Sequence, residues 1–406
     1  MAEDQQIRLD PRERRILAVT CLGHFLSHFN MLIFPALVLP LSSILGLKLG
    51  ETLALSFWMY LLFGISALPW GFIGDRIGAR PLMLIFYGGA GLSGISAAFF
   101  LSNPTAFSLS LASVGLFSGI YHPIGLGLIS KEVRHLSRAM GYNGMFGNLG
   151  LALAPLLAGL LNWLWGVKSA YIAVGLLNLA GFFLTLSSSE LQHSSSPHTK
   201  ETGDGGTALA FAILLIAMML GGIAYRGATV ISPTYFELKN QEVLRWLSGL
   251  AHTDLSANLV ATATASLIYL VGMLGQFTGG RVAERLDPRR SYLFFHLMVI
   301  PPAFLIPFTS NIGLVFLVVV YFFFLLGMQP IENTLVARFT PRRFHHSAYG
   351  AKFVLTFGVG AAAVKILQAI EARWGIEASF PSLGVVSVLL VITIMVIIKV
   401  TNPSQE

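Results

Sequence analysis

The chain has 406 residues, of which 55% are hydrophobic and 11% are charged. A soluble protein carries about 25% charged residues, so this composition excludes a water-soluble globular protein. Apolar runs of roughly twenty residues match the thickness of a bilayer core, and they lack the alternation of apolar and polar residues that a membrane barrel shows. A single cysteine, Cys21, excludes a disulfide framework. We therefore expect an all-α membrane protein.

Apolar runs bounded by charges or by Pro and Gly predict twelve transmembrane helices. In chain order they lie near 16–45, 51–74, 80–101, 105–130, 138–163, 168–188, 207–236, 255–281, 290–309, 313–338, 347–372 and 379–400. A short interfacial helix is expected within 237–254, the longest external loop, which contains Trp246 and Leu247.

Polar stretches divide these helices into two bundles. Residues 1–15 are polar and lack a cleavage site, so we expect a cytoplasmic tail that leads into an uncleaved first helix. The Ser- and Gly-rich stretch 189–206 cannot form a core and is expected to be a cytoplasmic linker. The expected bundles are 16–188 and 207–400, followed by a short cytoplasmic tail, 401–406.

Basic residues predict the orientation of the chain. Of the 26 Lys and Arg residues, five fall in loops on one side (Lys48, Lys168, Lys239, Arg245, Arg373) and three fall inside helices (Arg226, Lys352, Lys365). The others lie in the tails and loops on the opposite side. Because cytoplasmic loops are rich in Lys and Arg, we expect both termini on the cytoplasmic face of the inner membrane. Loops that face anionic lipid also account for the net charge of +7 without a nucleic-acid partner.

Two sequence patterns recur at nearly the same offset. Residues 71–80 (GFIGDRIGAR) align with 280–289 (GRVAERLDPR), and residues 122–124 (HPI) align with 329–331 (QPI). Each pair occupies equivalent helices of the two bundles. Such a repeat is typical of transporters whose halves are related by an axis along the membrane normal, with the solute site at the midplane between them.

The same motifs carry a family resemblance that covers essentially the whole chain. The loop at 71–80 resembles the signature between the second and third helices of the major facilitator superfamily. Within it, GHFLSH at 23–28 and GIYHPIGLGLIS at 119–130 resemble the branch of fosmidomycin-resistance-type efflux proteins. The resemblance implies the major facilitator fold and secondary transport by alternating access. That branch often carries an aspartate where this chain has His28, so its proton-coupling assignments do not transfer directly.

A run of small residues in the fifth helix resembles the antiporter motif of the same superfamily, with alanine in place of glycine at two positions. Small residues at three- and four-residue spacing let another helix approach closely, so a packing seam is expected, whereas antiport is implied by the resemblance only. The seam comprises Gly141, Gly150, Ala154, Pro155, Ala158 and Gly159.

Charges at the ends of the second and eighth helices predict a gating latch. An acid near a helix N-terminus is favoured by the helix dipole and can pair with Arg, and the glycines permit close approach. The alternative is ordinary loop charge. The first latch comprises Gly71, Asp75, Arg76, Gly78 and Arg80, and the second comprises Glu284, Arg285 and Arg289.

Ionisable and polar residues inside the predicted helices are candidates for a solute or proton site, because burying them is costly. His24 and His28 share one helix face, His122 precedes Pro123, and Arg226 should meet an acid or an anionic solute. Glu332 and Lys352 lie at matching depth and are expected to pair. Asn143 and Asn333 add hydrogen-bonding capacity. For each histidine, a neutral ring bonded to a backbone carbonyl is the structural alternative.

These observations predict a proton-coupled exporter of a small organic solute, anionic or zwitterionic, that works as a monomer. No Walker-type loop is present, and no cofactor or enzymatic activity is expected. Three alternatives remain: import of an organic anion, transport of a transition-metal ion held by His24, His28, His122 and Glu332, and a receptor without transport activity.

Overall fold

The structure is a computed structural model that describes residues 10–134, 136–188, 208–340 and 345–401. Within those ranges the chain is helical and contains no strand. The expected linker at 189–206, most of the N-terminal tail and the end of the C-terminal tail lie outside the described residues.

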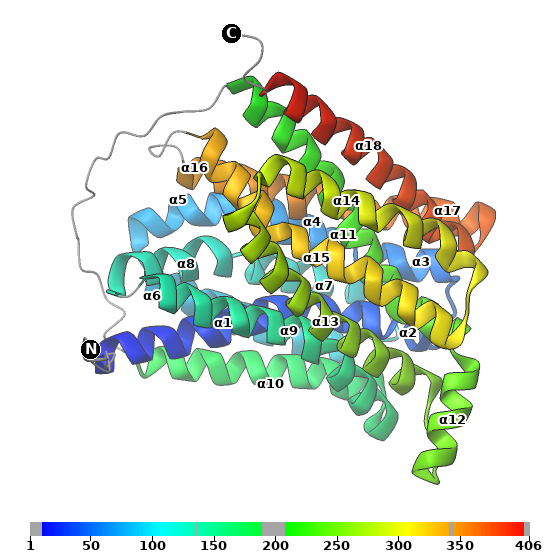
Figure 1. Ribbon diagram of the computed structural model, residues 1–406. Coiled ribbons are helices and arrows are strands. Elements are labelled where there is room, and N and C mark those ends of the chain that lie inside the picture. The colour runs from blue at the N-terminus through cyan, green and yellow to red at the C-terminus, as the bar shows by residue number, and fades with distance from the viewer. Residues whose placement is uncertain (1–9, 135, 189–207, 341–344, 402–406) are drawn as a thin grey trace, which may run out of the picture.

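The first half contains the helices coloured blue to green in Figure 1. They are α1 (Pro11–Ala36), α2 (Val38–Leu45), α3 (Leu49–Ala54), α4 (Phe57–Ile65), α5 (Ala67–Ile77), α6 (Ala79–Phe99), α7 (Pro104–Ser118), α8 (Tyr121–Glu132), α9 (Leu136–Trp165) and α10 (Val167–Leu186).

The second half contains the helices coloured green to red in Figure 1. They are α11 (Ala208–Lys239), α12 (Gln241–Ala251), α13 (Ala257–Arg285), α14 (Pro288–Leu305), α15 (Asn311–Phe339), α16 (His345–Phe353), α17 (Ala362–Trp374) and α18 (Ser379–Val400). Between α16 and α17 the chain forms a π-helical segment (Val354–Gly358) and a 3-10 turn (Val359–Ala361), and further 3-10 turns cover Ile306–Phe308 and Ile376–Ala378.

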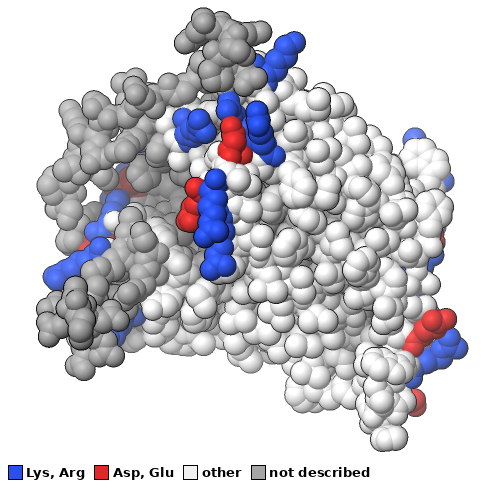
Figure 2. Space-filling view, in the orientation of Figure 1, with Lys and Arg blue, Asp and Glu red and all other residues white. Residues whose placement is uncertain are grey.

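Eleven helical segments in the described ranges are long and apolar enough to cross a bilayer, and a twelfth span results if one bent helix pair is counted. This confirms the all-α membrane architecture expected from the sequence. Figure 2 shows charged side chains at the two ends of the molecule, with a broad uncharged surface between them. The protein is therefore a multi-pass membrane protein.

The first helix begins at Pro11 rather than near residue 16. Asp10 and Glu13 form a capping box, in which each side chain accepts a hydrogen bond from the other residue's backbone N–H. Pro11 at the first helical position is also compatible with helix initiation, because its missing N–H would have no partner there. These local signals extend the helix into the segment that composition alone assigned to the tail.

The expected continuous helices 16–45 and 51–74 are both broken. The first ends at Ala36, and the second is divided into α3, α4 and α5. Segment 38–45 makes an angle of 107° with segment 49–65, around Gly46 at φ +63°. Pro35 and Pro40 explain the first break, because neither can donate a hydrogen bond to the carbonyl four residues earlier.

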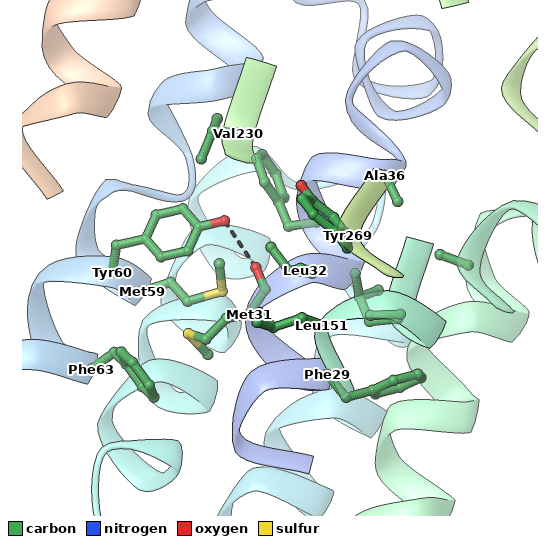
Figure 3. Close-up of a cluster of buried hydrophobic side chains, with 14 of the residues drawn as sticks. Phe29, Met31, Leu32, Ala36, Met59, Tyr60, Phe63, Leu151, Val230 and Tyr269 are labelled. Carbon is green, nitrogen blue, oxygen red and sulfur yellow. Dashed lines mark hydrogen bonds between the residues drawn. The ribbon is translucent and has the colours of Figure 1, made fainter. Parts of the chain in front are cut away.

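Side chains from neighbouring helices bond the carbonyls that these prolines leave free. Pro35 leaves the Met31 carbonyl without a helical donor, and the Tyr60 hydroxyl donates to it at 2.9 Å, as Figure 3 shows. Pro40 leaves the Ala36 carbonyl free, and the amide of Asn258 donates to it at 2.8 Å. Irregular helices inside a membrane need such compensation, because no water is available.

The second half repeats one of these arrangements. Pro233 in α11 leaves the Thr229 carbonyl free, and the Tyr269 hydroxyl of α13 lies 3.4 Å from it. Tyr60 and Tyr269 therefore perform equivalent roles in the two halves. In Figure 3 Tyr269 of the second half lies close to Leu32 and Ala36 of the first. These residues and Val230 belong to one buried apolar cluster, which the two halves therefore share.

The two halves are in close contact on one side of the molecule. We call the side that carries Pro11 and Thr401 the terminal side, and the opposite side the distal side. On the distal side the Asn162 amide donates to Asn258 at 3.0 Å, and the Gly50 N–H donates to Glu371 at 3.0 Å. A Cβ at Gly159 would lie 1.9 Å from the Thr262 hydroxyl.

On the terminal side the two halves diverge, as Figure 1 shows for α1 and α10 against α11 and α18. Among the described residues, each ion pair joins two residues of the same half. The described structure thus has a closed distal side and no salt bridge that closes the terminal side.

Helix α12 confirms the short helix expected within 237–254. None of its residues is buried, and Trp246 and Leu250 are exposed. The helix projects from the distal side of the bundle (Figure 1).

The bond between Tyr60 and Met31 can be tested by a double-mutant cycle. Tyr60→Phe should lower the free energy of unfolding by about 1–3 kcal/mol, because it leaves the buried Met31 carbonyl without a hydrogen-bond donor. In a Pro35→Ala background the alanine introduced at position 35 can bond that carbonyl, so the same change should cost much less. Unfolding of the four proteins in detergent measures both costs, and equal costs in the two backgrounds would contradict this account.

Candidate functional site

Arg226 lies at the contact between the two halves. It belongs to the stretch 221–236 of α11, in which every residue is buried, and its own side chain is 3% exposed. Its guanidinium carbon lies 3.9 Å from the centre of the Tyr60 ring, which belongs to α4 of the first half. The Tyr225 ring centre lies 5.9 Å away. The Arg226 guanidinium and the Tyr60 ring therefore connect the two halves through a cation–π contact.

The charge of Arg226 has no counter-charge among the described residues. In the described part of the chain no carboxylate pairs with this guanidinium, and its Nε has no hydrogen-bond partner. Burying an unpaired cation costs several kcal/mol. A single cation–π contact stabilises the charge by only about 2 kcal/mol, so it does not offset that cost. The arginine was expected to meet an acid or an anionic solute, and no described acid fills that role.

Three histidines come together in the first half. His24 and His28 lie near the middle of α1, and His122 lies at the start of α8. One ring nitrogen from each lies within 4.8 Å of the others. His24 and His28 remain partly exposed although they lie in mid-helix, so part of each ring is accessible from the interior of the bundle.

Hydrogen bonds fix the tautomers of two of these rings. His24 Nδ1 lies 2.8 Å from the Asn143 carbonyl, which can only accept, so Nδ1 carries the proton. His24 Nε2 then has a free lone pair, and His28 Nε2–H donates to it at 3.2 Å. Asn143 is fully buried, and its side-chain amide hydrogen bonds with the Tyr121 hydroxyl at 2.7 Å. The carbonyl-bonded alternative thus holds for His24 Nδ1 and leaves Nε2 available.

Aromatic rings of the second half cover this histidine cluster. The ring centre of His122 lies 5.0 Å from that of Phe353 and 5.9 Å from that of Phe357. Phe63 of α4 lies 5.7 Å from His122 and 5.5 Å from Phe357. The cluster therefore lies at the interface of the two halves. Its neighbour Phe63 is one helical turn from Tyr60, the ring that Arg226 contacts.

The expected ion pair between Glu332 and Lys352 is present. Lys352 Nζ lies 2.8 Å from Glu332 Oε1, and both side chains are buried. Lys352 also donates to Asn333 Oδ1, and the Tyr292 hydroxyl donates to Glu332 Oε2 at 2.7 Å. Each charge thus has a hydrogen-bond partner besides its counter-ion. Tyr292 was not among the expected site residues, although a tyrosine in an apolar helix is a visible signal.

A chain of amides links the two halves beside His24, which packs against Gly147, the residue before Asn148. The Asn148 amide of α9 donates to Gln276 of α13 at 2.8 Å, and the Gln276 amide donates to Gln329 of α15 at 2.8 Å. Gln276 was also missed, although it stands alone among apolar and small residues in the sequence MLGQFTGG. Its role depends on which residues of other helices it reaches, which the sequence alone does not specify.

The first latch motif makes its contacts within the first half. Asp75 lies 3.7 Å from Lys131 with both side chains exposed, and Arg80 donates to the Leu186 carbonyl at 2.9 Å. Gly78 adopts φ +85°, which permits the sharp turn between α5 and α6. Arg76 is exposed, and a Cβ at Gly71 would be in ordinary contact with Pro123. No latch contact between the halves forms in the described residues.

The second latch motif contacts its own half. Arg289 binds Asp287 at 2.7 Å and donates to the Thr401 carbonyl at 2.6 Å, which ties α14 to the end of α18. Hydrogen bonds from Arg289 lower the pKa of Asp287 to about 2. The carboxylate therefore stays charged above that pH in the folded protein. Its contribution to stability is fully present above the ordinary pKa of 3.8 and is lost as the pH falls through the folded pKa. Glu284 and Arg285 are exposed.

The seam residues of α9 face different partners. A Cβ at Gly150 would lie 2.2 Å from the Phe25 carbonyl of α1, whereas Gly159 faces Thr262 of the other half. A Cβ at Gly141 would meet nothing within 4 Å. Ala154 and Ala158 are fully buried, and Pro155 lies inside the helix. The seam therefore packs against α1 in its middle and against α13 at its distal end.

A sequence profile described as Major Facilitator Superfamily matches residues 20–365. The chain belongs to the Major Facilitator Superfamily. Multidrug resistance protein D of Escherichia coli (strain K12) is 25% identical over 258 residues, which covers 59% of this chain and 58% of that protein. The chain thus aligns with little more than half the length of this relative.

Solved structures of the superfamily share the fold. A peptide transporter POT in complex with sulfate matches with a TM-score of 0.73 and 15% identity, covering 95% of this chain and 94% of that one. The human organic anion transporter MFSD10 (TETRAN) matches with a TM-score of 0.66 and 17% identity, covering 95% of this chain and 100% of that one. Both solved structures are described as transporters. The family match makes the chain a transporter rather than an enzyme.

The buried ion pair between Glu332 and Lys352 can be tested by a second double-mutant cycle. Glu332→Gln or Lys352→Met alone should cost about 3–5 kcal/mol, because each leaves a buried charge without its partner. The double variant should lower the free energy of unfolding by clearly less than the sum of the two single changes. Unfolding in detergent measures all three. Additive costs would show that the two charges do not stabilise each other.

Proposed function

We propose that this protein is a secondary carrier that moves a small organic anion across the cytoplasmic membrane by alternating access. The observation that carries the proposal is Arg226, a buried cation at the contact between the halves with no described acid partner. A guanidinium presents several N–H donors in a planar fork that matches a carboxylate or phosphate. An anionic solute would supply the missing counter-charge there.

Export is the direction we propose. It is supported by the resemblance to fosmidomycin-resistance-type efflux proteins and by the weak similarity to a multidrug resistance protein. The fold neighbours include a protein described as an organic anion transporter and a peptide transporter bound to sulfate, which agrees with an anionic solute. Import of the same anion would use the same site, and the direction of the driving gradient distinguishes the two.

Protons are the proposed coupling ion. Glu332 and Lys352 form a buried pair, and Lys352 also donates to Asn333, so the lysine would keep a hydrogen-bond partner when a proton replaces it at the Glu332 carboxylate. The three histidines offer further proton acceptors near the solute site. No cofactor enters this scheme, and one chain contains every residue that it uses.

The closed distal side gives the latch a proposed role. If both termini lie in the cytoplasm, as the basic loops predict, the described state is closed to the outside. Among the described residues the charges Asp75, Arg76 and Arg80 make no contact across the halves. We propose that these charges, and their counterparts Glu284 and Arg285, connect the halves in the opposite state. Transport of a metal ion is the alternative, and we favour an organic anion because Arg226 is itself a cation and offers a metal no ligand.

Arg226 variants in proteoliposomes test the proposed function. With a panel of radiolabelled organic anions and an imposed pH gradient, Arg226→Ala should reduce transport at least about tenfold, because a hydrogen bond to a charged group contributes about 1.5–3 kcal/mol. Arg226→Lys should retain part of the activity, because it keeps the charge and loses the planar fork. Collapse of the pH gradient should stop accumulation.

The matched control is Lys365→Ala, which removes an exposed intramembrane cation whose Nζ lies 3.3 Å from Gln368. This variant should transport like the wild type. If Arg226→Ala transported every anion of the panel at the wild-type rate, the proposed function would be wrong.

A further inference from the structure

The three histidines satisfy the distance requirement of a transition-metal site. Histidine nitrogens bind such ions at about 2.0–2.1 Å, so two ligands of a tetrahedral site lie about 3.4 Å apart. His24 Nε2 and His28 Nε2 lie 3.2 Å apart, and a nitrogen of His122 completes a group within 4.8 Å. Small side-chain rotations, together with a tautomer change that moves the His28 proton from Nε2 to Nδ1, would direct a lone pair of each histidine at one ion.

The surroundings of His24 match those of a metal ligand. Metal-binding histidines usually donate their second ring N–H to a carbonyl or carboxylate, which fixes the ring and its tautomer. His24 Nδ1–H donates to the Asn143 carbonyl at 2.8 Å and leaves Nε2 directed toward His28. The Asn143 side chain is in turn held by Tyr121. This support is independent of the distances among the three rings.

The ligand set is neutral and incomplete. Three imidazoles supply three of the four positions of a tetrahedral site, and such sites leave a position open for an exogenous ligand. Among the described residues no acid joins the three histidines. A bound divalent ion and the nearby Arg226 would form two uncompensated cations, so an anion between them would be favoured.

We propose that His24, His28 and His122 bind one divalent transition-metal ion, and that an anion held by Arg226 occupies its open position. Imidazole ligands suit zinc, nickel and cobalt(II) rather than magnesium or calcium. The anion part of this proposal rests on the proposed function. The metal site itself does not depend on it.

Calorimetry with ZnCl₂ tests the metal site in purified, full-length protein from which any polyhistidine tag has been removed. One ion should bind per chain. His28→Ala and His122→Ala should each weaken binding at least about tenfold, in line with the losses seen at metal sites when supporting groups are removed. His296→Gln, which changes a buried histidine of α14 outside the cluster, should bind zinc like the wild type.

Thermal unfolding of each variant confirms that it is folded, and zinc should raise the unfolding temperature of the wild type and of His296→Gln only. Absence of zinc binding to folded wild-type protein would overturn the proposal. Equal binding by the wild type, His28→Ala and His122→Ala would overturn it as well.

Azide tests the open position and the role of Arg226. Added to cobalt(II)-loaded protein, azide should change the visible absorption spectrum, and Arg226→Ala should need at least about tenfold more azide for the same change. No spectral change, or the same azide dependence in both proteins, would overturn the anion part. If the protein binds no zinc and azide causes no spectral change, but anion transport still depends on Arg226, only the metal proposal is wrong. If transport is also independent of Arg226, the proposed function is wrong too.

Discussion

The uncompensated charge of Arg226 is the constraint around which the interior of this transporter is arranged. The side chain is almost fully buried, and the face of Tyr60 is its nearest described partner. A positive charge in such surroundings is costly until an anion joins it. Because Tyr60 and Arg226 belong to different halves, the charge lies where the two bundles must move relative to each other. A solute that pairs with it would alter the contact between the halves.

Prolines and glycines allow the halves to approach around this charge. Pro35 and Pro233 each free a carbonyl that a tyrosine of the neighbouring helix can bond, so both halves hold an aromatic side chain toward the interface. On the distal side Gly159 permits contact with Thr262, and Asn258 bonds the carbonyl freed by Pro40. The backbone irregularities that weaken single helices therefore provide the polar contacts between helices. Ion pairs between described residues at the helix ends stay within their own halves in this state.

Hydropathy and local spacing predicted the all-α fold and the number of spans, because a bilayer imposes helix length and composition. Depth along adjacent helices likewise predicted the Glu332–Lys352 pair. The sequence could not predict which groups complete each site. The Tyr60 face under Arg226 and the position of Gln276 depend on how two separate bundles pack, and the early start of α1 depends on a capping box that hydropathy ignores. The domain limits, the membrane orientation and the roles of the site residues remain predictions.

The most direct test supplies Arg226 with a counter-charge from the protein itself. Tyr60→Glu places a carboxylate beside the guanidinium, and Tyr60→Gln is its uncharged match. If Arg226 is an unpaired anion receptor, then without solute Tyr60→Glu should unfold at a higher temperature than Tyr60→Gln. It should also lose the stabilisation by organic anions that Tyr60→Gln retains, because the internal carboxylate occupies the site. A lower unfolding temperature for Tyr60→Glu, together with undiminished stabilisation by anions, would contradict this account.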